Sequence, residues 1–235
     1  MPRSPLIGIT ADLAKNDVGR LRHQVNETYI SCVVRAGGVP IILPAITEVR
    51  LAMLDLLDGI VLTGGDDIDT RPFGTPLHER AACMHPQRQQ ADFALLAALE
   101  DRPDLAVLGI CLGMQQMGVH AGCRLIQHLH DVVDNGDRHG RDNAHPVATA
   151  FGDGSIASWH HQALAEPGPF HAVGHSDDGL LEAIRHRERH FYVGVQWHPE
   201  RTDDEALGLG MFKQLTAAAA NASASASAGA SAAAR

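Results

Sequence analysis

Apolar residues follow two alternating patterns along the first two-thirds of the chain. Short continuous apolar runs predict buried strands at residues 6–10, 39–44, 58–65 and 105–110. Apolar positions recur at helical spacing in three intervening segments: residues 24–36, a segment that ends near Leu57, and residues 89–100. Alternating strands and helices of this length predict a largely parallel sheet with helices on both faces.

The pattern changes after Gly122, where short strand candidates follow one another closely. Five runs have strand character: residues 124–126, 145–150, 170–176, 180–186 and 191–197. Asp177-Asp178-Gly179, between two of these runs, is a hairpin signal. The sheet is therefore predicted to gain antiparallel strands in this part of the chain.

The C-terminal part divides into a helix and a low-complexity tail. Residues 203–216 predict a closing helix, and residues 217–235 are almost entirely Ala and Ser. The tail has no apolar face to bury, so we expect it to be disordered, with a partly helical tail as the alternative because polyalanine favours helix. We see no internal repeat, and we expect a single domain over residues 1–216 followed by a tail over residues 217–235.

Composition and charge exclude several classes of protein. The formal net charge of -9 argues against a nucleic-acid-binding surface. No apolar stretch approaches the ~18–20 residues of a membrane span, and the N-terminal apolar run is too short for a signal peptide. The four cysteines show no CxxC spacing, which favours thiols in a reducing cytoplasm.

Fifteen histidines are unusual for this length, and several fall in residues 127–140. This segment, QHLHDVVDNGDRHG, contains His128, His130, Asp131, Asp134 and His139. Imidazoles and carboxylates together could hold a metal ion. No spacing such as HExxH supports a metal site, so a solvated polar loop is the favoured interpretation.

Cys111 stands where the predicted strand 105–110 turns into a helix, in VLGICLGMQQMG. Ligands of open α/β sheets bind at the carboxyl ends of the strands. The G-x-C-x-G turn is mechanically similar to the G-x-S-x-G nucleophile elbow, in which Gly109 and Gly113 would make room for a strained residue. A helix N-terminus and a nearby imidazole can lower a thiol pKa from about 8.5. The alternative is a small buried cysteine at a strand end.

The segment GVQWHPE, residues 194–200, supplies the second element of a site. His198 and Glu200 are two residues apart, so in extended chain both side chains would point to one side. A carboxylate beside an imidazole fixes its tautomer and stabilises imidazolium. HPE alone is a weak signal, but together with an elbow cysteine it strongly predicts a Cys-His-Glu triad.

A glycine pair in LTGGDD, residues 62–67, is the third element. One of its backbone N–H groups could join the N–H of Leu112 to bind an oxyanion. A tight turn without catalytic function is the alternative for this segment.

Taken together, these motifs resemble the class I glutamine amidotransferase-like proteins, and among them the gamma-glutamyl-gamma-aminobutyrate hydrolase group. The resemblance covers nearly the whole chain, with AGGVPIILP, DGIVLTGGDDIDTRPFG, LGICLGMQ, SWHHQAL, HSDDGLLEAI and GVQWHPE as its marks. It implies an α/β fold: a single-domain sandwich with a largely parallel central sheet flanked by helices, the flavodoxin-like class I glutamine amidotransferase fold.

The resemblance also implies roles for individual residues. Cys111 would be the nucleophile, His198 the base and acid, and Glu200 its orienting partner. Gly65 and Leu112 would form the oxyanion hole. Substrate would be bound by Gly64, Gln115, Ser158, His160 and Gln162. His161 could equally be a packed or solvated histidine.

The chain departs from the hydrolase group at three positions. Leu112 stands where arginine is common, Thr70 where proline is frequent, and Cys123 where glycine is usual. The first departure bears on substrate choice and leaves the triad intact.

The function expected from this resemblance is hydrolysis of gamma-glutamyl amides, such as gamma-glutamyl-gamma-aminobutyrate, without a metal or organic cofactor. The alternatives are a glutaminase subunit that supplies ammonia to a separate synthase, and a non-catalytic binding protein. We expect a small-molecule substrate, no nucleic-acid or membrane partner, and a homodimer as one option.

Overall fold

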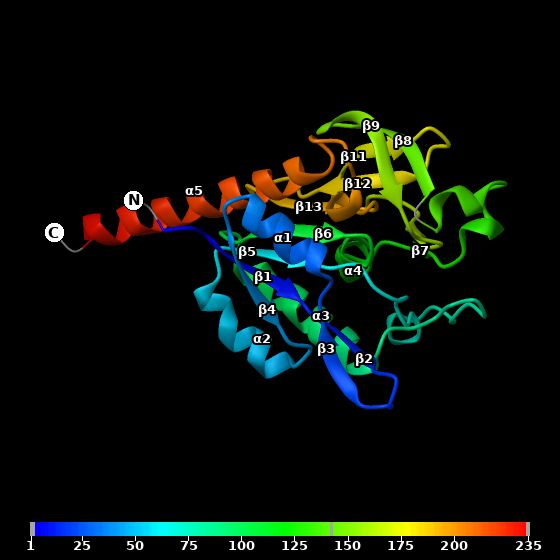
Figure 1. Cartoon of the computed structure of the whole chain (residues 1–235), viewed down its shortest axis with the longest axis horizontal. Coiled ribbons are helices and arrows are strands. Elements are labelled where there is room, and N and C mark those ends of the chain that lie inside the picture. Colours follow the sequence, from blue (N-terminus) through cyan, green and yellow to red (C-terminus); the bar gives the residue numbers. More distant parts are fainter. Residues whose placement is uncertain (1–2, 142, 234–235) are drawn as a thin grey trace.

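A nine-stranded sheet runs through the whole protein, in the strand order β4-β1-β5-β6-β13-β12-β11-β8-β9 (Figure 1). The computed structural model describes residues 3–141 and 143–233, with the side chains of the last helix described as far as residue 222. The strands of this sheet, in chain order, are β1 Leu6–Thr10, β4 Val39–Leu43, β5 Gly59–Leu62, β6 Ala106–Ile110, β8 Asn143–Thr149, β9 Gly152–Ser158, β11 His171–Ser176, β12 Leu181–Arg185 and β13 Tyr192–Val195.

The strands from β4 to β13 pair in parallel and are covered by helices on both faces. Along β5, Val61 packs in one hydrophobic cluster, whereas Ile60 and Leu62 pack in the other. Successive side chains of a strand point to opposite faces, so a strand buried on both sides appears in sequence as an unbroken apolar run. The strands predicted at residues 6–10, 39–44, 58–65 and 105–110 are confirmed, although β5 ends at Leu62 before the glycine turn and β4, at the sheet edge, is only partly buried.

Two pairs of helices enclose this parallel region. α1 (Glu27–Arg35) and α5 (Leu209–Ala233) cover one face, and α3 (Pro86–Ala98) and α4 (Leu112–His120) cover the other, with α2 (Thr47–Met53) packed beside α3 (Figure 1). Among the described residues, no helix combines the length and the apolar character needed to cross a membrane.

The remaining strands of the sheet, from β12 to β9, pair antiparallel. The predicted hairpin is confirmed, because Asp177-Asp178-Gly179 links β11 to β12 and Gly179 has a φ of +87°. A separate two-stranded sheet joins β7 (Leu125–Ile126) to β10 (Ala163–Leu164). This antiparallel part forms the end of the molecule opposite β4 (Figure 1).

One hairpin was not predicted from the sequence. β2 (Asp12–Lys15) pairs with β3 (Leu21–Gln24), and the Asn16 side chain accepts backbone N–H bonds from Val18 and Arg20 in the turn. The expected helix over residues 24–36 starts later, at Glu27, because β3 extends through Gln24. All four residues of β3 are exposed, so neither face of the strand has to be apolar. Its sequence therefore lacks the alternation of apolar and polar residues that predicts a half-buried strand.

The C-terminal segment differs from the expected disordered tail, because α5 continues through the Ala/Ser segment to Ala233. The helix also starts later than the predicted residue 203, at Leu209. Ala218 and Ala219 belong to the hydrophobic core, beyond the expected domain boundary at residue 216. Alanine has the highest helix propensity, and its methyl group fits where the helix lies close to the sheet at Gly59.

Truncation after Thr216 is therefore expected to lower the free energy of unfolding by about 1–2 kcal/mol relative to truncation after Ala222. The loss comes from the buried methyl groups of Ala218 and Ala219 and from the last turns of the docked helix. Urea denaturation of the two truncated chains measures it. Equal unfolding midpoints would show that residues 217–222 contribute nothing to stability.

Candidate active site

The carboxyl ends of three adjacent parallel strands bring the candidate residues together. β6 lies between β5 and β13, and the three run in the same direction. Cys111 directly follows β6, the segment Thr63-Gly64-Gly65 follows β5, and His198 lies three residues after β13. Parallel strands therefore place the predicted nucleophile, base and oxyanion loop at one edge of the sheet.

Cys111 has the backbone geometry of a nucleophile elbow. Its φ of 51° and ψ of -103° lie in a region that non-glycine residues rarely adopt. Gly113 is required by close packing, because a Cβ there would lie 2.4 Å from the carbonyl oxygen of Leu62. The tight turn from strand to helix places the buried Cys111 side chain in the lining of two cavities.

His198 and Glu200 form the ion pair expected from the predicted triad. His198 Nδ1 lies 2.7 Å from Glu200 Oε1, and both side chains are buried. The expected extended geometry is wrong in its detail, since a 3-10 turn begins at Pro199 and brings the two side chains together. Nδ1 is thus held by the carboxylate, and the other side of the ring interacts with the Cys111 thiol.

The surroundings of His198 favour its protonated form. Burial lowers the imidazole pKa, but the charge of a Cys111 thiolate, its hydrogen bond and the Glu200 carboxylate outweigh burial and raise this pKa to about 9. His198 is therefore a cation at neutral pH when Cys111 is a thiolate. This is the charge state needed to donate a proton to a leaving group.

Cys111 lies between two cavities. The first has a volume of about 330 Å³, and the second about 220 Å³. Both are lined by Gly65, Asp66, Cys111 and Trp159. The first cavity is also lined by His198, Tyr29, Arg201 and several polar residues, namely Asp12, Gln24, Asn26 and Thr63. The second extends along Asp67, Gln115, His160, His161 and Gln162. A substrate bound across the thiol can thus place its acyl and amine parts in separate spaces.

The two predicted oxyanion donors flank the nucleophile. The Gly64 N–H donates to Tyr29 Oη at 3.1 Å, so of the glycine pair Gly65 is the one left to donate toward substrate. Leu112 is the first residue of α4, and an N–H at that position has no intrahelical partner. The side chain of Leu112 is buried in the core and lines neither cavity.

The predicted substrate-binding residues divide into two groups. Gln115 donates from Nε2 to the carbonyl of Gln162 at 3.1 Å, and both residues line the second cavity. His160 lines the same cavity, but its Nδ1 bonds the carbonyl of Gln162 at 2.9 Å and its Nε2 is directed toward Glu182. Ser158 lies outside both cavities, because its fully buried hydroxyl donates to the carbonyl of His139 at 2.8 Å.

His161 is placed in the site by an ion pair rather than by packing. Its Nε2 lies 3.0 Å from Asp67 Oδ2, and this hydrogen bond raises the His161 pKa. The ring lines the second cavity and stays partly exposed to solvent.

A buried charge network beneath the glycine turn was missed by sequence reasoning. The fully buried Arg88 guanidinium donates to the carbonyl of Gly64 at 2.9 Å and to Asp12 Oδ1 at 2.9 Å. Asp92 pairs with Arg88 and also with the buried Arg50. A Cβ at Gly65 would lie 2.1 Å from Arg88 Nη1. This close approach explains why the second residue of the pair Gly64-Gly65 is a glycine. An Arg and an Asp four residues apart are typical of an exposed helix face, so the sequence shows no sign that this pair is buried.

Residues 5–200 match the family model described as peptidase C26. The chain belongs to this family of class I glutamine amidotransferase-like hydrolases. The peptidase C26 match spans Cys111, His198, Glu200 and the glycine turn.

Individual relatives agree with the peptidase C26 assignment. A protein of Mycobacterium tuberculosis named as a candidate glutamine amidotransferase is 34% identical, over 92% of this chain and 75% of its own. The gamma-glutamyl-gamma-aminobutyrate hydrolase of Escherichia coli O157:H7 is 30% identical, over 86% of this chain and 88% of its own. A solved structure from Thermoplasma acidophilum, described as a component of GMP synthase, shares the fold with a TM-score of 0.67 at 17% identity, over 93% of this chain and 96% of its own.

Proposed function

We propose that the protein hydrolyses gamma-glutamyl amides through a Cys111 thioester and releases glutamate and an amine larger than ammonia. The observation that carries the proposal is the position of Cys111, beside the His198–Glu200 pair and between two cavities. The resemblance to gamma-glutamyl-gamma-aminobutyrate hydrolases supports the substrate class.

The reaction follows from the geometry in two steps. The Cys111 thiolate attacks the side-chain amide carbonyl, and the N–H groups of Gly65 and Leu112 stabilise the oxyanion. His198 gives its proton to the amine as the C–N bond breaks, which leaves a thioester. The neutral imidazole then takes a proton from water, the hydroxide attacks the thioester, and glutamate leaves as Cys111 returns to thiolate.

The first cavity supports an amine larger than ammonia. Its volume of about 330 Å³ far exceeds the roughly 10–15 Å³ that a water-sized molecule needs. Its carboxylates, Asp12 and Asp66, favour a neutral or cationic amine over an acidic one. Burial and the charge of Asp12 raise the pKa of Asp66, as expected for two carboxylates close together.

We also propose that the enzyme acts in the cytoplasm. All four cysteines are free thiols, including the nucleophile. A reducing compartment keeps such thiols from oxidation.

Substrate preference is the direct test of this function. We expect kcat/KM for a neutral gamma-glutamyl alkylamide and for gamma-glutamyl-gamma-aminobutyrate to exceed that for glutamine by at least about tenfold, because both fill the first cavity. Of the two, the neutral amide is expected to be the better substrate. Glutamate release from the three compounds, measured on one preparation without added partners, gives the comparison.

A variant that fills the first cavity provides the control. Gln24→Trp should lower kcat/KM for the larger substrates more than for glutamine, since Gln24 lines this cavity. Arg22→Trp changes a residue on the same strand that lies outside the cavity lining. It should leave the ratio of kcat/KM for the larger substrates to kcat/KM for glutamine unchanged. Glutamine as the best of the three substrates would instead favour a glutaminase that feeds a separate synthase.

A further inference from the structure

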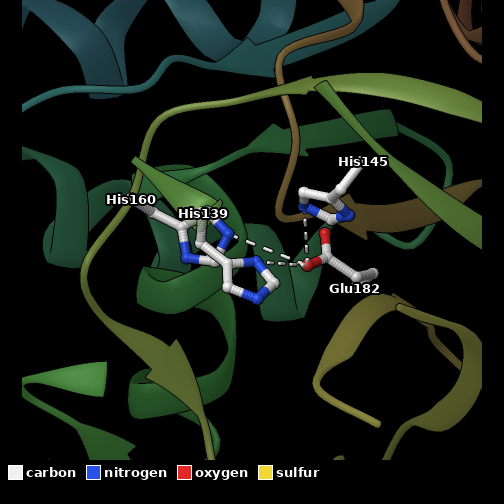
Figure 2. A group of neighbouring side chains, drawn as sticks. All are labelled: His139, His145, His160 and Glu182. Carbon is white, nitrogen blue, oxygen red and sulfur yellow. Dashed lines mark ion pairs between the residues drawn. The ribbon is translucent and has the colours of Figure 1, made fainter. Parts of the chain in front are cut away.

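Three histidines surround a buried glutamate in the antiparallel part of the fold, away from the triad. His139, His145 and His160 lie around Glu182, and all four side chains are buried (Figure 2). They come from four separate segments: the 3-10 turn Gly136–His139, β8, the segment after β9, and β12. Their potential ligand atoms all lie within 4.8 Å of one another.

The inward atoms of this cluster have no hydrogen-bond partner among the described residues. They are Nδ1 of His139, Nε2 of His145, Nε2 of His160 and both carboxylate oxygens of Glu182. Glu182 Oε1 lies 3.6 Å, 3.8 Å and 3.7 Å from the three nitrogens, too far for hydrogen bonds. Buried polar atoms without partners cost free energy, so a cation, or a proton on one of the rings, would stabilise the arrangement.

The outward nitrogens of the three rings fix the tautomers. His139 Nε2 lies 2.9 Å from Asp178 Oδ2, His145 Nδ1 lies 3.2 Å from the carbonyl of Pro146, and His160 Nδ1 lies 2.9 Å from the carbonyl of Gln162. All three partners are acceptors, so the outward nitrogens carry the protons. With that proton in place, a ring that carries no second proton presents a lone pair to the centre, where the carboxylate is also an acceptor.

Four acceptors that converge on one point match the ligand set of a cation. We propose that His139, His145, His160 and Glu182 bind a structural Zn²⁺ ion. Three imidazoles and a carboxylate suit zinc, and a closed set of four protein ligands is typical of a structural zinc site. A tetrahedral ion with ligands at about 2.0–2.1 Å has them about 3.3–3.4 Å apart, only a few tenths of an ångström shorter than the distances to Glu182 Oε1. The bond from His139 to Asp178 is the carboxylate contact that orients the ring of many zinc-binding histidines.

The ion would fix one wall of the active site. His160 is two residues from the end of β9 and lines the second cavity, and the Cys111 thiol donates to the carbonyl of its neighbour Trp159 at 3.7 Å. The His160 N–H also bonds the carbonyl of His139 at 2.7 Å. A zinc ion at this place would join the turn Gly136–His139, β8, the segment 158–162 and β12.

The test is metal content measured on the folded chain. Tag-free protein is stripped with a chelator, supplied with Zn²⁺ and desalted, and native mass spectrometry then reports both bound metal and compactness. We expect about one Zn²⁺ per wild-type chain, an increase in thermal midpoint on zinc addition, and tetrahedral visible absorption when Co²⁺ replaces zinc. Wild type that retains no zinc after desalting would overturn the proposal and leave a protonated histidine as the partner of Glu182.

Variants assign the ligands. Glu182→Gln and His145→Gln should lose stoichiometric zinc, and Asp178→Asn should weaken its binding by about 10–100-fold. His175→Asn is the matched control, because His175 is exposed on the neighbouring strand β11. Zinc retained by both Glu182→Gln and His145→Gln at the wild-type level would show that the metal is bound elsewhere. These readouts do not depend on the substrate or on catalysis.

Discussion

Cys111→Ala is expected to lower kcat/KM for gamma-glutamyl amides by at least about 10⁴-fold, while the fold is retained. The substitution removes the only atom that can form the thioester and changes little volume. It also leaves the elbow, both cavities and the His198–Glu200 pair in place. Steady-state assays of glutamate release, with circular dichroism on the same samples, measure the two parts of the prediction.

The backbone of Cys111 provides a second readout. A φ of 51° with a ψ of -103° costs a non-glycine residue about 1–3 kcal/mol, a strain that glycine avoids. Cys111→Gly should therefore be inactive and at least as stable as Cys111→Ala. Cys83→Ser, at a partly exposed cysteine outside both cavities, should keep wild-type activity. Activity near wild type in Cys111→Ala would exclude the thioester mechanism.

His198→Ala is expected to be nearly as damaging as loss of the nucleophile, with a decrease of about 10⁴-fold in kcat/KM. His198 is expected to act twice: it donates a proton to the leaving amine, and it then accepts a proton from water. Glu200→Gln should cost less, about 10²–10⁴-fold, because the amide still bonds Nδ1 but no longer balances the imidazolium charge. Full activity of Glu200→Gln would make Glu200 a structural residue.

His198 also makes the free energy of unfolding depend on pH. The pKa of His198 is raised from 6.5 to about 9 in the folded protein, so its stabilising contribution is complete below about pH 6.5 and is lost as pH increases through about 9. Urea denaturation at several pH values measures this effect. Between about pH 6.5 and 9, the free energy of unfolding should decrease less in His198→Ala and Cys111→Ala than in the wild type. An equal decrease in all three proteins would assign the pH dependence to other groups.

Local patterns predict the parts of this fold that are buried on both faces or turn sharply. The apolar runs of β1, β5 and β6 and the elbow at Cys111 can be recognised in the sequence because each depends on neighbouring residues only. The exposed strand β3 carries no such pattern, although Gln24 at its end lines the first cavity. The helical continuation of α5 depends on where the sheet leaves room for alanine, which composition does not reveal.

Contacts between distant segments are where sequence reasoning fails. Arg88 and Asp92 have the spacing of a surface ion pair, and only the folded chain brings Asp12 and the Gly64 carbonyl against them. His139 belongs to a segment with the sequence of a polar loop, but its three companions come from other strands and loops. No short sequence motif contains all four residues, so the sequence alone could not predict that they form one cluster.

The position of β13 has a consequence for biosynthesis. This strand is the last of the sheet to leave the ribosome, yet it lies in the middle, between β6 and β12. Until it is added, β6 and β12 are unpaired edges of apolar strands, the kind of surface on which chains aggregate. Release or cleavage of the chain before Val195 would therefore leave two half-sheets prone to aggregation and would remove the predicted base His198.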